Sequence, residues 1–68
     1  MPISEMHDWL QRAVDLKHPP AFSMLGEFLE NGAVGYTRDA DKALSLYRQG
    51  AELGDIKSKQ ALIRLINK

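Results

Sequence analysis

The chain has 68 residues, no net formal charge and no cysteine, so disulfide bonds cannot stabilise it. A domain of this size buries only about 60% of the surface that its unfolded chain exposes, and it therefore depends on closely packed elements or on a partner. The balanced charge and the ordinary apolar content give no reason to expect disorder or general affinity for nucleic acid.

The first predicted helix covers residues 3–17. Its apolar residues recur at spacings of three and four, which is the period of a helix with one apolar face. The stripe consists of Ile3, Met6, Leu10 and Ala13, with Trp9 and Leu16 beside it. Pro19 and Pro20 end this helix, because the residue before a proline avoids the α region. The same prolines are tolerated in the first turn of the next helix.

The second predicted helix is short and ends at Asn31-Gly32, a common C-terminal stop. We expect its core-facing residues to be Ala21, Met24, Leu25, Phe28 and Leu29. A loop with two glycines follows over residues 31–38. Asp39 is a favourable N-cap for the third helix, and Asp41 lies in the first turn, where the helix dipole favours a negative charge.

The third predicted helix is apolar on two adjacent faces and ends at Gly54. One face carries Ala40, Ala43, Leu44, Tyr47 and Ala51, and the other carries Leu46, Gly50 and Leu53. Residues 55–68 are again helical, with Ile56, Leu62, Leu65 and Ile66 expected to point inward. The sequence therefore predicts an all-α fold of about four helices in antiparallel pairs, without strands.

The chain also contains an internal repeat. A shift of 37 residues aligns apolar and small residues of two helices; the pairs include Trp9 with Leu46, Leu10 with Tyr47, Ala13 with Gly50, Ala21 with Ser58 and Leu25 with Leu62. A period in the high thirties with two helices per unit is typical of an α-solenoid.

These residues resemble the Sel-one-like repeat family, a relative of the tetratricopeptide repeat. The first half of its unit is matched by Ala21, Leu25, Gly26, Phe28 or Leu29, and Gly32; the second half is matched by Asp39, Lys42, Ala43, Leu44, Tyr47, Ala51 and Gly54. The resemblance implies a single domain over residues 1–68: 3–17 is the second helix of a partial unit, 20–54 is one full unit, and 55–68 is a closing helix. That makes a short solenoid of roughly one and a half to two units.

Three residues depart from the family pattern. Gly50 stands where the family usually has Ala, and Lys17 stands where it usually has Gly. Ile63 stands where Leu-Gly would continue a further repeat, so the last helix looks adapted as an end. These differences leave the fold expectation unchanged and concern the packing at the two ends.

No catalytic, metal-binding or phosphate-binding motif emerges from the sequence. The glycines of residues 30–55 are not followed by the Gly-Lys of a phosphate loop, and Asp39 and Asp41 do not continue into a calcium loop. His7 and His18 lack further ligands at metal-binding spacing. We expect Trp9 and Tyr47 to pack in the core. The sequence therefore predicts no enzymatic activity and no cofactor.

The charge is distributed unevenly along the chain. Residues 1–36 carry five carboxylates against two basic side chains, whereas residues 55–68 carry four basic side chains against one carboxylate. Such a molecule can stack head to tail or steer a charged partner, although a solvated basic tail accounts for the pattern equally well. No apolar run spans a membrane, and the N-terminal segment has no secretory pattern. We therefore expect a soluble cytoplasmic domain that binds neither membrane nor nucleic acid.

The first functional hypothesis is a non-catalytic adaptor or scaffold that binds another protein. The family places the first helix of each unit on the concave side of the solenoid. Transferred to this chain, that points to outward residues of the second and last helices, namely Ser23, Glu27, Glu30, Lys57, Lys59 and Arg64. The alternatives are a small inhibitor or immunity-type protein that caps another protein, and a structural solenoid that associates with itself as a homodimer.

Overall fold

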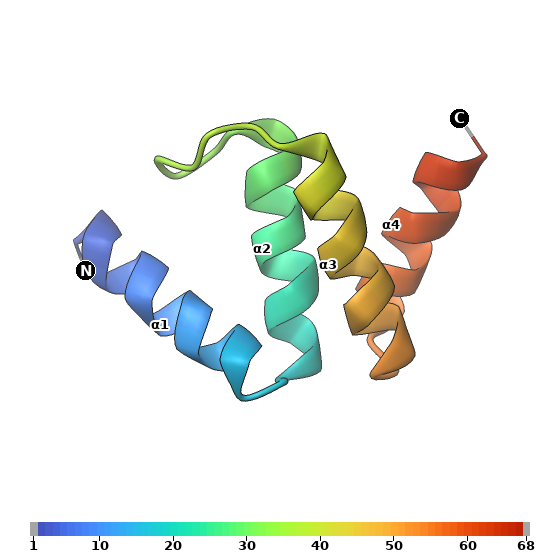
Figure 1. The fold of residues 1–68 in the computed structure, drawn as a ribbon, viewed down its shortest axis with the longest axis horizontal. Coiled ribbons are helices and arrows are strands. Elements are labelled where there is room, and N and C mark those ends of the chain that lie inside the picture. The colour runs from blue at the N-terminus through green and yellow to red at the C-terminus, as the bar shows by residue number, and fades with distance from the viewer. Residues whose placement is uncertain (1, 68) are drawn as a thin grey trace.

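The structure is a computed structural model that describes residues 2–67. These residues form four helices and no strand, which confirms the predicted all-α fold. The helices are α1 (Ile3–Asp15), α2 (Pro19–Asn31), α3 (Ala40–Glu52) and α4 (Ile56–Ile66). Consecutive helices run in roughly opposite directions, and α2 and α3 lie side by side in the middle of the molecule (Figure 1).

The helix ends follow from local sequence chemistry. Pro19 and Pro20 occupy the first turn of α2, where a missing N–H costs no hydrogen bond. Gly32 ends α2 in a left-handed conformation with φ of 66°, which glycine adopts without strain. The carboxylate of Asp39 accepts a 3.1 Å hydrogen bond from the Lys42 amide and caps α3.

The core lies where α2, α3 and α4 meet. Its centre is Tyr47 of α3, which has no solvent exposure and whose ring lies against Gly26 of α2. The buried apolar side chains are Leu10, Ala13, Ala21, Phe22, Leu25, Leu29, Ala43, Leu46 and Tyr47. Small residues allow the helices to approach closely. A Cβ atom at Gly26 would clash with the ring of Tyr47, and one at Gly50 would clash with Phe22 and Ser58.

Several residues that the sequence placed in the core are exposed instead, among them Met24, Ile56 and Ile66. Met24 lies on a side of α2 that no other helix covers, while Ile56 and Ile66 lie in the first and last turns of α4. The apolar period identified which residues share a face. It did not identify which faces have a neighbouring helix, and that is the reason for the wrong prediction.

Helix α1 is attached differently from the other three. Among the described helices it packs against α2 alone. The N-terminal half of α1 contacts the loop between α2 and α3. There, Nε2 of His7 on α1 donates a 2.6 Å hydrogen bond to the carbonyl oxygen of Val34 in the loop. The His7 ring also stacks on Tyr36 at 3.8 Å between ring centres, and Tyr36 stacks on Phe28 of α2 at 5.8 Å.

The 37-residue period of the sequence recurs in the helix boundaries. A shift of the α1 bounds, Ile3–Asp15, by 37 residues gives the α3 bounds, Ala40–Glu52, and the same shift moves the start of α2 to the start of α4. The connections match as well, because Lys17 and its counterpart Gly54 both have positive φ, of 59° and 91°. Two helix pairs with matching positions along the chain thus follow one another.

The close packing around Gly50 makes a testable prediction. A Cβ atom at Gly50 would lie 2.8 Å from Cβ of Phe22 and closer still to the Ser58 hydroxyl. We therefore expect Gly50→Ala to lower the free energy of unfolding by about 1–2 kcal/mol, although alanine forms helix more readily than glycine by about 1 kcal/mol. The exposed neighbour substitution Arg48→Ala should change it by no more than about 0.5 kcal/mol. Urea denaturation measures both; a Gly50→Ala protein as stable as the wild type would contradict the packing.

Candidate functional site

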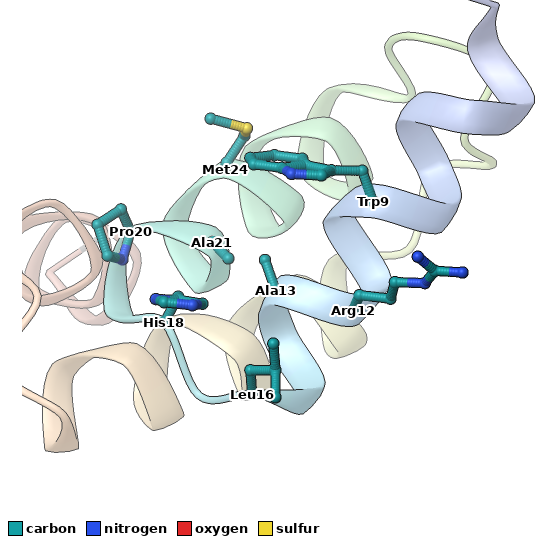
Figure 2. A pocket seen from close by; sticks show the side chains of 8 residues that line it. All are labelled: Trp9, Arg12, Ala13, Leu16, His18, Pro20, Ala21 and Met24. Atoms are coloured by element: carbon teal, nitrogen blue, oxygen red, sulfur yellow. The ribbon is translucent and has the colours of Figure 1, made fainter.

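An apolar groove lies between α1 and α2. Trp9 extends from α1 toward Met24 on α2, and Leu16 lies at the end of α1 beside the turn into α2 (Figure 2). The hollow has a volume of about 430 Å³. Its lining consists of Trp9, Arg12, Ala13, Leu16, His18, Pro20, Ala21 and Met24. We call it the Trp9 groove.

The Trp9 groove exists because α1 has a helix on only one side. Trp9 is 55% exposed, whereas its repeat counterpart Leu46 on α3 is 6% exposed. Helix α3 packs against both α2 and α4, but α1 packs only against α2 among the described helices. The prediction that Trp9 packs in the core was therefore wrong, because that prediction assumed for α1 the second neighbour that α3 has.

A second groove lies between α2 and the start of α4. Its volume is about 450 Å³, and its lining consists of Pro19, Pro20, Ser23, Met24, Glu27, Gly54, Asp55, Ile56 and Lys57. The two grooves share Pro20 and Met24. They are therefore neighbours on α2 near its N-terminal end and together make a concave surface, which is apolar on the α1 side and includes Glu27, Asp55 and Lys57 on the α4 side. We call the second part the Lys57 groove.

The structure brings some of the six predicted partner-binding residues together. Glu27 and Lys57 are exposed and line the Lys57 groove, whereas Lys59 is exposed on α4 and lines neither groove. Ser23 is only 3% exposed, and its hydroxyl donates a 2.9 Å hydrogen bond to the carbonyl oxygen of Pro20. The prediction that Ser23 points outward was wrong, because α2 turns this side toward α4.

Glu30 and Arg64, the other two predicted residues, bind each other across α2 and α4. The two terminal guanidinium nitrogens of Arg64, Nη1 and Nη2, donate 2.9 Å hydrogen bonds to the Glu30 carboxylate. The buried Tyr47 hydroxyl donates a 2.8 Å hydrogen bond to the same carboxylate. This cluster joins α2, α3 and α4 at the far end of the α2–α4 face, so reversing the charge of Arg64 would also remove its ion pair with Glu30.

The environment of Tyr47 also changes its acidity. Burial raises the pKa of the Tyr47 hydroxyl above its usual value, and the hydrogen bond to Glu30 and the negative charge of that carboxylate raise it further. The pKa of the Arg64 guanidinium is raised as well, chiefly by its hydrogen bonds to Glu30. Both shifts favour the protonation states that hold the cluster together.

The sequence did not identify the residues of the Trp9 groove as a surface. Trp9, Leu16 and Met24 follow the helical apolar period, so the pattern assigned them to the core. The 37-residue repeat contained a usable signal, because within residues 2–67 the first helix is paired with the second alone, whereas its counterpart, the third, has a helix on either side in the chain. A tryptophan on the unpaired side of that helix is a candidate for a binding surface.

Within residues 2–67, no three His, Cys, Asp or Glu side chains are placed to hold a metal ion. None of the helices in this range has the length and apolarity that crossing a membrane requires. The concave surface provides apolar contact at Trp9, Leu16 and Met24 and opposite charges at Glu27 and Lys57.

The tyrosine at the centre of the cluster predicts how stability depends on pH. An unfolded tyrosine loses its proton near pH 10, whereas folded Tyr47 keeps it to a higher pH. The unfolded chain then binds fewer protons than the folded chain, so stability falls as pH rises above about 10. We expect Tyr47→Phe to lose about 1–2 kcal/mol of stability at pH 7 and to fall less steeply than the wild type above pH 10.

Denaturation by urea at several pH values between 7 and 11 measures this difference. Tyr36→Phe is the matched control, because burial also raises the pKa of Tyr36 but no carboxylate hydrogen bond adds to it. Stability curves of the wild type and Tyr47→Phe that stay parallel up to pH 11 would show that Tyr47 is not held in its protonated form.

Comparison with known proteins gave no match: no family model, no curated protein and no solved structure corresponds to this chain at a significant level. The resemblance to the Sel-one-like repeat therefore stays a prediction from the sequence.

Proposed function

We propose that the chain is a non-catalytic interaction module, similar to a Sel-one-like repeat, that binds a segment of another protein on the concave surface along α2. The observation that carries the proposal is the Trp9 groove, where a half-exposed tryptophan, Leu16 and Met24 gather around a hollow of about 430 Å³. Exposed aromatic anchors beside a hollow are typical of protein-binding surfaces. The absence of cysteine suits a module that works in the reducing cytoplasm.

The size of the Trp9 groove indicates how the partner must bind. Completing the burial of three half-exposed side chains supplies about 3 kcal/mol. Association itself costs at least about 4 kcal/mol in lost freedom of movement. The partner must therefore extend beyond this groove into the Lys57 groove, where Glu27 and Lys57 can pair with its charges.

A helix is the form of partner segment that suits this surface best. The Trp9 groove lies between two helices and is lined at helical spacing by Trp9, Arg12, Ala13 and Leu16 on α1 and the turn that follows it. An amphipathic helix places residues three and four apart on one face and can seat them in such a groove. Its charged flank would then face Arg12 at the rim.

The experiment selects helical peptides without tryptophan from a displayed library and titrates them against the protein. Trp9 is the only tryptophan in the chain, so its fluorescence reports directly on the groove. We expect binding to shift its emission to shorter wavelength, because the partner removes water from the indole.

Met24→Gln and Leu53→Gln form a matched pair for this test. Both side chains are 40% exposed, but only Met24 lines the grooves. We expect Met24→Gln to weaken binding about tenfold, whereas Leu53→Gln binds like the wild type. Equal affinity of the two variants, or binding without a change in Trp9 emission, would place the binding surface elsewhere.

A further inference from the structure

Met24 occupies the junction of the concave surface. It lines both the Trp9 groove and the Lys57 groove, and Pro20 is the other residue that the two grooves share. Trp9 extends from α1 toward the Met24 side chain, and both line the same hollow (Figure 2). Met24 is 40% exposed and does not belong to the cluster of buried apolar side chains. A chemical change at Met24 therefore alters both grooves and leaves the core as it is.

The thioether of Met24 is a group that can undergo such a change. Among the residues that line the two grooves, Met24 alone contains sulfur. Hydrogen peroxide oxidises an accessible methionine to its sulfoxide, and methionine sulfoxide reductases reverse the reaction. A sulfur lone pair attacks one peroxide oxygen, so an S–O bond forms as the O–O bond breaks. The sulfur loses an electron pair, and the second oxygen leaves as water.

The sulfoxide changes the surface from apolar to polar at its junction. Its oxygen is a hydrogen-bond acceptor that holds water, whereas the thioether of Met24 offers apolar contact. A partner whose apolar face covers Met24 must remove this water and provides no donor in exchange. Burying a polar group without a hydrogen bond is unfavourable, so the oxidised surface binds such a partner more weakly.

We propose that Met24 is a modification site, and that its reversible oxidation by hydrogen peroxide releases the partner from the concave surface. This inference rests on the proposed function, because it takes the partner segment expected there and adds how its binding is regulated. Oxidation of Met24 lowers the affinity without unfolding the chain, since the side chain lies outside the core. Reduction of the sulfoxide restores the apolar surface and the binding.

The first part of the experiment follows the modification without a partner. The protein is treated with dilute hydrogen peroxide, freed from it and digested, and mass spectrometry of the fragments locates the added oxygen. We expect Met24 to gain one oxygen atom while the urea midpoint of unfolding stays unchanged. The emission of Trp9 should shift to longer wavelength, because the sulfoxide holds water in the groove that the indole lines. Met24→Leu should show no such shift after the same treatment.

The second part measures binding with helical peptides that contain neither methionine nor tryptophan and that were selected on the unoxidised protein. We expect oxidation of the wild type to weaken binding about tenfold, as Met24→Gln does, and treatment with a methionine sulfoxide reductase to restore it. Met24→Leu should bind equally well before and after peroxide, because leucine conserves the apolar volume.

Met6→Leu is the matched control for the second part. Met6 is a half-buried methionine of α1 that lines neither groove. Because Met6→Leu keeps Met24, its affinity should fall on oxidation as that of the wild type does. The comparison of the two leucine variants therefore assigns the effect to one sulfur atom.

Three results would overturn the proposal. One is a Met24 that takes up no oxygen while the protein is folded. Another is an oxidised wild type that binds the selected peptides as tightly as the unoxidised protein. The third is a loss of affinity that persists in Met24→Leu. If no peptide binds the unoxidised protein, the proposed function and the release of a partner both fail, whereas an oxidised Met24 with shifted Trp9 emission still establishes the modification site.

Discussion

The close approach of three helices around Tyr47 is the constraint on which the rest of the structure depends. The ring of Tyr47 can be fully buried because Gly26 on α2 has no side chain at the point of contact. Gly50, one turn further along α3, leaves room for Phe22 and Ser58 in the same way. The hydroxyl of Tyr47 then reaches Glu30, which also binds Arg64. A single side chain thus links α2, α3 and α4 by packing and by hydrogen bonds.

This arrangement determines which side of α2 stays open. Helix α3 covers one side of α2, and the side that carries Ser23 and Glu30 faces α4. Only the remaining side of α2 is therefore open. Helix α1 does not share the Tyr47 contact and is held instead by α2 and by the stack of His7 on Tyr36. It therefore diverges from α2 (Figure 1), and the space between them becomes the Trp9 groove (Figure 2).

The sequence predicted the helices well because their ends depend on local chemistry. Pro19, Gly32 and Asp39 act within a few residues of their own positions, and the structure places helix ends at all three. The repeat of 37 residues was also visible in the sequence and recurs in the helix bounds.

The surface was harder to predict, because exposure depends on which helix lies next to a given face. Trp9 and Leu46 have equivalent sequence positions, yet only Leu46 has helices on both sides of its own helix. Ser23 was misassigned for the opposite reason, since a polar side chain was taken as exposed although α4 covers it. The Glu30–Arg64 pair joins residues 34 positions apart and follows from the packing of α2 on α4, which no local pattern describes.

The account rests on the observation that, among the described helices, α1 packs against one helix where α3 packs against two. Native-state hydrogen exchange at low protein concentration tests this claim directly, because each amide reports the free energy of the opening that exposes it. The amides of Leu10 and Ala13 should exchange through an opening of α1 that costs less than global unfolding, whereas those of Tyr47 and Gly50 should exchange only when the whole molecule unfolds. If α1 and α3 exchange with the same free energy, α1 is as fully supported as α3, and the open groove is not a feature of the molecule in solution.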